Sequence, residues 1–202
     1  MSNDTPKSIT PDGSAPFAPT MPERSLPLEF YIDANRINAR QGLPNMNQLE
    51  KWHSDHVISI QMAEEAHDEA SRGDSPERTR KAKSYIYSIV SPEMQAQCQH
   101  ILKEIECILF PGGVQSPSQL NDVTIVFNAA HYMAILVTND GDSSTQPNGI
   151  LGNRNGLAKY VQVMRDSEAV ELVRERIRQR DERARKVASM TGQPLPEWVC
   201  KD

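Results

Sequence analysis

The sequence predicts an α/β fold: a three-layer α/β/α sandwich with a mostly parallel central sheet and a disordered N-terminal arm. Two observations lead to this fold class. Short apolar runs of strand type alternate with longer segments of helical periodicity, an alternation typical of parallel sheets covered by helices. Ser-Pro pairs also recur where helices should begin, because serine caps the first turn and proline fits its backbone.

The chain of 202 residues is long enough for one domain with a hydrophobic core. Residues 1–27 contain six prolines and seven serine or threonine residues, so this arm is predicted to be disordered. The folded domain is expected over residues 28–190, followed by a C-terminal tail over 191–202. No apolar run approaches the roughly 20 residues that span a bilayer, and the N-terminus lacks the apolar stretch of a signal peptide. We therefore expect a cytoplasmic protein with no membrane partner.

The individual elements follow from short apolar runs and from helix caps. Apolar residues alternate with others in the first run, which ends on Asp33. Strands are predicted at residues 28–32, 57–63, 134–138 and 159–163. Ser75, Ser91 and Ser116 each precede a proline and mark helix starts. Helices are predicted over residues 45–56, 64–70, 76–90 and 92–109, over a segment that begins at Pro117 and reaches Ala130, and over 166–190.

Charge and cysteine content exclude some classes of protein. The net charge of −5 argues against a general nucleic-acid coat, which would be basic. It does not argue against an enzyme that acts on nucleic acid, because a cluster of metal-binding acids lowers the net charge. The odd number of cysteines (Cys98, Cys107 and Cys200) and the absence of a CxxC pair indicate neither a disulfide framework nor a thiolate zinc site.

Acidic residues follow the predicted strands. Asp33 ends the first strand, Glu64 and Glu65 follow the second, and Asp140 follows the run from 134 to 138. Asp122 lies near the start of the helix that leads into that run. Functional groups of open parallel sheets gather outside the carboxyl ends of the strands, so one crevice could collect these acids. The alternative is that they only cap helices and form turns, as Asn-Asp-Gly at 139–141 commonly does.

Three sequence motifs resemble those of the PIN-domain ribonucleases, a family that includes the VapC-type toxins of bacterial toxin–antitoxin pairs. They are YIDAN at 31–35, ISIQMAEEA at 58–66 and DVTIVFNAAHYMAILVTND at 122–140. In the third motif an apolar residue, an alanine, a threonine and an aspartate lie three, seven, sixteen and eighteen residues after the first aspartate. The resemblance covers about residues 28–180 and implies the PIN fold and ribonuclease activity.

Aligned residue by residue, the resemblance implies an acidic quartet. Its members are Asp33, Glu65, Asp122 and Asp140, with Glu64 as the alternative glutamate. Thr138 matches the small hydroxyl residue near the last acid, and Asn35 matches the asparagine of the first motif. The chain departs from the family in the basic stretch 36–40, in Val126-Phe127-Asn128, in its length and in its two terminal extensions.

Four crowded carboxylates favour a hard divalent cation, Mg²⁺ or Mn²⁺, which takes oxygen ligands and activates water. Together with the resemblance, this chemistry implies a metal-dependent endoribonuclease that cleaves single-stranded RNA. Its expected partners are the RNA substrate, an antitoxin protein and a second copy of the chain. The alternatives are a non-catalytic PIN-like module that binds protein or RNA, and a DNA-directed nuclease of the flap-endonuclease type. For the latter the sequence shows neither a helical arch nor a helix–hairpin–helix.

Other candidate groups have simpler interpretations. His53, His56 and His67 have no further zinc ligand at matching spacing, so we expect core or solvated histidines. Arg154 and Lys159 flank the polar loop and could contact phosphates or be ordinary surface charges. The segment 171–186 holds seven basic and four acidic residues, which predicts a solvated helix face with charge pairs.

Overall fold

The computed structural model describes residues 19–72, 75–141 and 149–202. The first eighteen residues of the predicted arm and most of the polar loop after Asp140 lie outside the described residues. Five strands form one sheet in the order β3-β2-β1-β4-β5, and every neighbouring pair is parallel. Their bounds are β1 (Glu29–Ile32), β2 (Ser59–Ala63), β3 (Ile86–Ser88), β4 (Ile135–Val137) and β5 (Val163–Met164). The predicted fold class is confirmed.

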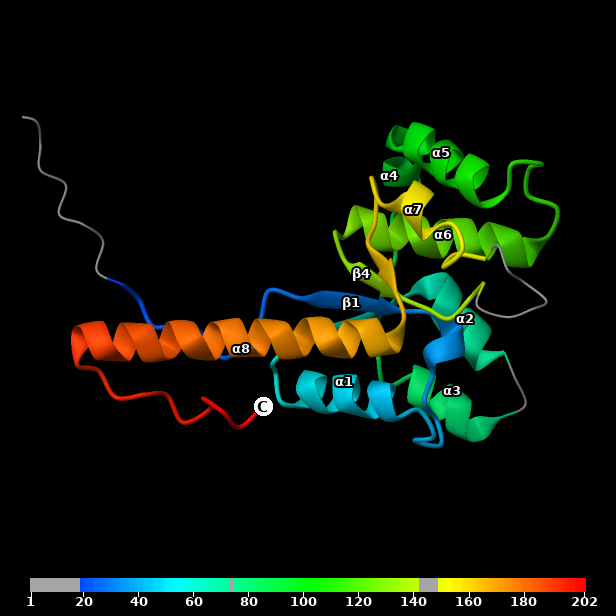
Figure 1. The fold of residues 1–202 in the computed structure, drawn as a ribbon. Helices are drawn as coiled ribbons and strands as arrows, with labels where there is room; N and C mark the ends of the chain where they lie inside the picture. The colour runs from blue at the N-terminus through cyan, green and yellow to red at the C-terminus, as the bar shows by residue number, and fades with distance from the viewer. Residues whose placement is uncertain (1–18, 73–74, 142–148) are drawn as a thin grey trace, which may run out of the picture.

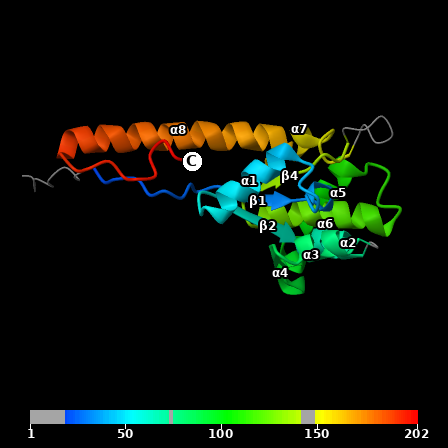
Figure 2. The ribbon, with the colours of Figure 1, turned by 90° about the horizontal axis from the view of Figure 1, so that it is seen from below.

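Helices cover both faces of this sheet. On one face α1 (Pro44–Ser54) packs against the long α8 (Asp166–Thr191). On the other face α6 (Pro117–His131) packs against α2 (Glu64–Ser71) and α5 (Gln99–Leu109). Figure 2 shows α8 on one side of β1 and α6 and α2 on the other.

The core is built around β1, the central strand. Phe30, Tyr31 and Ile32 are all inaccessible to solvent, because helices cover both faces of a parallel sheet. The residues that follow β1 and its neighbour β4 are therefore attached to well-packed strands that fix their positions.

The segment from 76 to 109 differs from its prediction. The Ser-Pro starts are confirmed, since the side chains of Ser75 and Ser91 both accept backbone hydrogen bonds as N-caps. The predicted helix 76–90, however, stops at the end of α3 (Pro76–Ala82). The aromatic and β-branched residues that follow instead form β3, which pairs with β2 at the edge of the sheet. The predicted helix 92–109 is divided at Cys98 into α4 (Pro92–Gln97) and α5.

The last strand also lies later than predicted. Residues 159–162 are not in a strand, and β5 begins at Val163, where its backbone pairs with β4. The prediction missed the short helix α7 (Arg154–Leu157) that precedes it. The helix predicted at 166–190 is confirmed as α8, which ends before Gly192 in the left-handed region at φ 71°.

The chain just before β1 and the chain after α8 both lie beside the C-terminal half of α8 (Figure 1). The backbone N–H of Leu26 donates to Val57 at 2.7 Å. Arg24 forms a 2.5 Å ion pair with Asp202, and Arg180 of α8 contacts the same carboxylate at 3.0 Å. Residues 24–26 therefore belong to the folded domain, and the predicted arm of residues 1–27 is too long.

Candidate active site

The candidate site lies at the carboxyl ends of the two central strands. β1 and β4 are neighbours, with Ile32 paired to Val137. Because the strands are parallel, the residues that follow them, Asp33 and Thr138, emerge at the same edge of the sheet. The backbone N–H of Asp33 donates to the carbonyl of Val137 at 3.0 Å and fixes this junction.

The Asp33 carboxylate is held by side chains that the sequence motifs singled out. Its Oδ2 accepts hydrogen bonds from Thr138 Oγ1 and from Asn35 Nδ2, both at 2.6 Å. Asn35 also donates to Thr138 Oγ1 at 3.1 Å, and that oxygen accepts the backbone N–H of Asp140 at 3.0 Å. These contacts join the first and third motifs into one network and fix the orientation of the carboxylate.

Burial makes the charge of Asp33 unfavourable. Asp33 is only 6% exposed, and burial raises the pKa of its carboxyl to about 6. The hydrogen bond from Thr138 opposes this shift, whereas the negative charges of Glu69 and Asp140 add to it. The carboxyl therefore lies near other acids as well as in the protein interior.

Asp122 belongs to the same cluster. It lies in the second turn of α6, whose start is fixed by the Ser116 cap. Burial and, after it, the charges of Asp140, Asp33 and Glu69 raise the pKa of Asp122 to about 7. Asp33 follows β1, Asp122 lies on α6 and Asp140 follows β4, and the charges of Asp140 and Asp33 both act on Asp122.

Asp140 also forms the turn that its sequence context suggests. Its Oδ2 accepts the backbone N–H of Ile150 at 2.8 Å, and its carbonyl accepts that of Leu151 at 2.9 Å. Gly141 has φ 89°, and a Cβ there would lie 2.6 Å from the nitrogen of Gly149, so only glycine fits. Asp140 therefore both stabilises the turn and contributes its charge to the acidic cluster.

Glu65 has a different set of partners from these three aspartates. Its Oε2 accepts a 2.9 Å hydrogen bond from Asn128 of α6, and burial raises the pKa of its carboxyl. The acids that contribute to this shift are Glu64 and Asp68, its neighbours in the chain. No contact couples Glu65 or Glu64 to the cluster within the described residues.

Glu69 is the glutamate whose charge acts on the cluster. It lies on α2 four residues after Glu65, hence about one helical turn further along. Its charge raises the pKa values of both Asp33 and Asp122. The i,i+4 relation to Glu65 was the only signal in the sequence, since the motif alignment ends at residue 66.

The carboxylates of the cluster are suitable ligands for a hard cation, but their spacing in the structure is too wide for them to hold one. Carboxylate oxygens are the ligands that Mg²⁺ and Mn²⁺ prefer. Among the residues that the structure describes, however, no three His, Cys, Asp or Glu side chains lie close enough to hold one metal ion. Burial is the largest cause of the raised pKa values of Asp33 and Asp122, and the repulsion between the carboxylates adds to both shifts and opposes a closer approach. Cation binding would require the carboxylates to approach one another.

Two arginines border the cluster. Arg36 Nε donates to Asn35 Oδ1 at 3.0 Å, and its Nη1 lies 3.4 Å from the carboxylate of Asp166. Arg78 donates to the carbonyl of Ala34 at 2.9 Å. The basic stretch after the first motif was the signal for Arg36, whereas nothing in the sequence pointed to Arg78.

The remaining candidates have structural partners. His53 Nδ1 accepts the backbone N–H of Ile60 at 3.2 Å, and His67 stacks on Tyr87 at 4.5 Å. Two cations that flank the polar loop pair with surface acids: Arg154 with Glu168 at 3.0 Å and Lys159 with Glu104 at 2.5 Å.

Comparison of the chain with protein-family models, with curated proteins and with solved structures found no match. In the described part of the chain, no helix combines the length and the apolar character needed to cross a membrane.

Proposed function

We propose that this protein is a divalent-cation-dependent ribonuclease of PIN type that hydrolyses phosphodiester bonds of single-stranded RNA. The proposal rests on three acids of the matched motifs, Asp33, Asp122 and Asp140, because the charges of Asp33 and Asp140 act on Asp122 and that of Asp140 acts on Asp33. Two of these carboxyls have pKa values raised by burial and by the charges of the others. Such crowding is costly in a structural role and is common at catalytic sites.

Each acid has a distinct role in this proposal. Asp33, held by Thr138 and Asn35, presents a fixed carboxylate, and Asp122 and Asp140 complete the set that would hold Mg²⁺ or Mn²⁺. The bound cation would offset the repulsion between the carboxylates and supply an activated water. The glutamate position has two candidates: Glu65, which the motif favours, and Glu69, which the electrostatic coupling favours.

The test is cleavage of a fluorescently labelled single-stranded RNA by purified protein with Mn²⁺ or Mg²⁺. We expect cleavage that chelation abolishes and that Asp122→Asn reduces by orders of magnitude, because this change removes one carboxylate and keeps the shape. A duplex DNA substrate should stay intact. Cleavage by the Asp122→Asn variant at the wild-type rate would refute the assignment of this site.

A non-catalytic PIN-like module that binds protein or RNA is the second candidate. The separation of the carboxylates in the described residues favours it, because three acids that cannot share an ion do not form a metal centre. This candidate predicts RNA or protein binding that is insensitive to Mn²⁺ and no cleavage under any metal condition. The same RNA assay, together with a binding titration in chelator, separates the two functions.

A further inference from the structure

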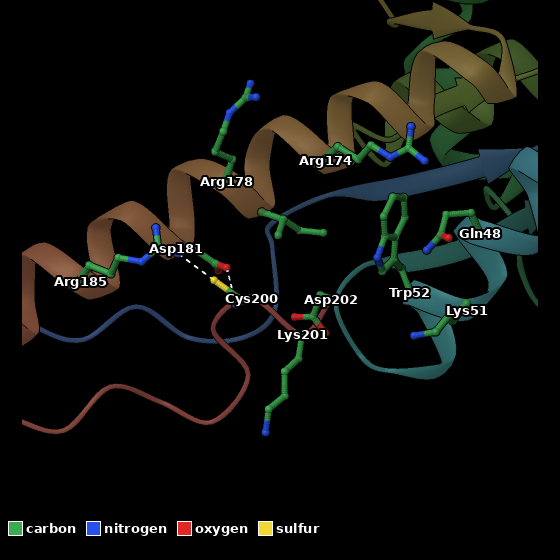
Figure 3. Close-up of a pocket in the computed structure, with 11 residues that line it drawn as sticks. Gln48, Lys51, Trp52, Arg174, Arg178, Asp181, Arg185, Cys200, Lys201 and Asp202 are labelled. Carbon is green, nitrogen blue, oxygen red and sulfur yellow. Dashed lines mark hydrogen bonds between the residues drawn. The ribbon is translucent and has the colours of Figure 1, made fainter.

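A cavity lies between α1, α8 and residues 200–202, away from the acidic cluster. Its volume is about 560 Å³, within the range of small-molecule sites. Figure 3 shows the side chains that line it from these three walls. Five basic residues contribute to the lining: Lys51, Arg174, Arg178, Arg185 and Lys201.

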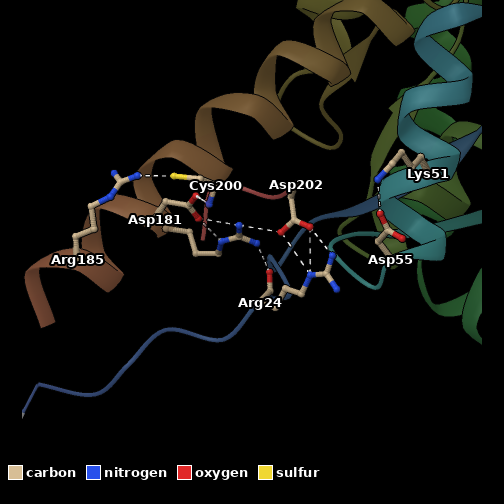
Figure 4. A network of polar contacts seen from close by, with 8 residues as sticks. Arg24, Lys51, Asp55, Asp181, Arg185, Cys200 and Asp202 are labelled. Atoms are coloured by element: carbon tan, nitrogen blue, oxygen red, sulfur yellow. Dashed lines mark hydrogen bonds and ion pairs between the residues drawn. The ribbon is translucent and has the colours of Figure 1, made fainter. Parts of the chain in front are cut away.

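The two acids in the lining are already neutralised. Asp181 and Asp202 both contact the buried guanidinium of Arg180, at 2.8 and 3.0 Å, and Arg24 adds a second cation on Asp202 (Figure 4). Burial would raise the pKa of Asp202, but the hydrogen bonds from Arg24 and Arg180 lower it, so this carboxylate stays ionised and paired. Arg180 also lies 4.3 Å over the ring of Trp198, which fixes its position. The two acids of the lining therefore do not offset its five basic residues, of which Lys51, Arg174 and Arg178 have acidic partners outside the lining.

The cationic side chains are available to a ligand. Within the described part of the chain, Lys51 and Arg174 pair only with acids close by in the sequence, Asp55 and Glu171, and the Lys51 and Arg174 side chains are 59% and 57% exposed. Exposed pairs of this kind are weak, so an incoming anion can replace the acid. Lys201 has no ion-pair partner among residues 19–72, 75–141 and 149–202.

The wall of the cavity also contains an unused hydrogen-bond donor. Trp52 is 2% exposed, and its indole Nε1 has no hydrogen-bond acceptor in the structure. In Figure 3 the nitrogen edge of this ring faces the space bounded by α8 and the 200–202 segment. The Nε1 atom itself is closed to solvent, so the indole N–H reports on a ligand in the adjoining cavity through a change in its surroundings.

We propose that this cavity binds a phosphate group of a small phosphorylated molecule. Several cations around one small space suit a tetrahedral oxyanion of high charge, and arginine binds phosphate with two parallel hydrogen bonds. The volume leaves room for a nucleoside beside the phosphate. The proposal is independent of the ribonuclease, because none of the cluster acids lines this cavity.

The test uses the indole N–H signals of ¹⁵N-labelled protein, which has two tryptophans. Trp198→Phe assigns the signal of Trp52. We expect inorganic phosphate to shift the Trp52 signal saturably, while sodium chloride at equal ionic strength leaves it in place. The variant Lys51→Ala/Arg174→Ala/Lys201→Ala removes one exposed cation from each wall. It should weaken binding by roughly ten-fold or more, since hydrogen bonds to charged groups are the strong ones.

The matched control is Lys83→Ala/Lys103→Ala/Arg40→Ala, which removes the same charge from exposed positions outside the cavity. It should bind phosphate as the wild type does, and denaturant unfolding confirms that each variant is folded. Titration with adenosine monophosphate and with adenosine separates the sources, because only the phosphorylated compound should bind. Equal shifts with chloride, or equal affinities of the two triple variants, would overturn the proposal.

Discussion

Replacement of Asp122 by Asn should stabilise the protein when no divalent cation is present. The pKa of Asp122 is raised from 3.8 to about 7, so the folded state holds its proton more tightly than the unfolded state. Wild-type stability should therefore fall as pH rises from about 4 to about 7, and the Asn variant should lack this contribution. The amide keeps the shape of the side chain and removes the charge that Asp33 and Asp140 repel.

The size of the effect follows from the shift. About three pKa units correspond to an upper bound of about 4 kcal/mol, and partial solvent access reduces the expected gain to about 2 kcal/mol at pH 8. For a domain of this size, that gain raises Tm by about 4–8 °C. The gain should nearly vanish at pH 4, where the folded wild type is protonated at this site.

The assay is thermal and denaturant unfolding of wild type and Asp122→Asn in chelator, at pH 8 and at pH 4. Glu182→Gln is the control, because Glu182 is an exposed acid of α8 and its change should have little effect at either pH. Equal or lower stability of Asp122→Asn at pH 8 would show that neither burial nor the neighbouring charges make the ionised Asp122 carboxylate unfavourable in the folded protein.

Three further predictions concern the glutamate, the cation and the termini. Glu69→Gln should lower the pKa values of Asp33 and Asp122, because the Glu69 charge raises both, whereas Glu65→Gln should leave these two pKa values unchanged, because the acids that act on Glu65 are Glu64 and Asp68; NMR titration of both variants in chelator decides this, and the reverse result would favour Glu65 as the cluster glutamate. Millimolar Mg²⁺ or Mn²⁺ should raise the Tm of the wild type, since a ligand that binds only the folded state stabilises it; the shift should be lost in Asp33→Asn, and its absence from the wild type would count against a metal site. Deletion of residues 1–27 should lower Tm more than deletion of 1–18, because Arg24 and Leu26 contact the domain; equal Tm values would show that these contacts contribute no stability.

Local signals in the sequence predicted where elements begin better than where they end. Ser75, Ser91 and Ser116 each cap a helix as expected, because the cap depends only on a few neighbouring residues. The strand Ile86–Ser88 was missed because it is held by pairing with β2, a contact between segments distant in the sequence. The hydrophobic pattern of such a short run is compatible with a helix as well as with a strand.

The candidate site likewise has features that local sequence predicts and features that depend on contacts between distant segments. The resemblance of the motifs singled out Asp33, Asp122 and Asp140, and for Asp33 and Asp140 there was a second reason, because the carboxyl ends of parallel strands meet at one edge. Glu69 could not be chosen over Glu65 from the motif, since the difference depends on how α2 packs on α6. The pKa values of Asp33 and Asp122 depend on burial and on distant charges, neither of which the sequence displays.

The most direct test of the central claim compares Asp140→Asn with Asp142→Asn in cleavage of single-stranded RNA with Mn²⁺. Asparagine keeps an oxygen that can accept the Ile150 N–H and keeps the turn, so a purely structural Asp140 would tolerate the change. If Asp140 acts with Asp33 and Asp122 on a cation, cleavage by Asp140→Asn should fall by orders of magnitude while Asp142→Asn, outside the matched motif, stays near the wild-type rate. Equal cleavage by wild type and Asp140→Asn would contradict the proposed function and leave the acid as a turn residue alone.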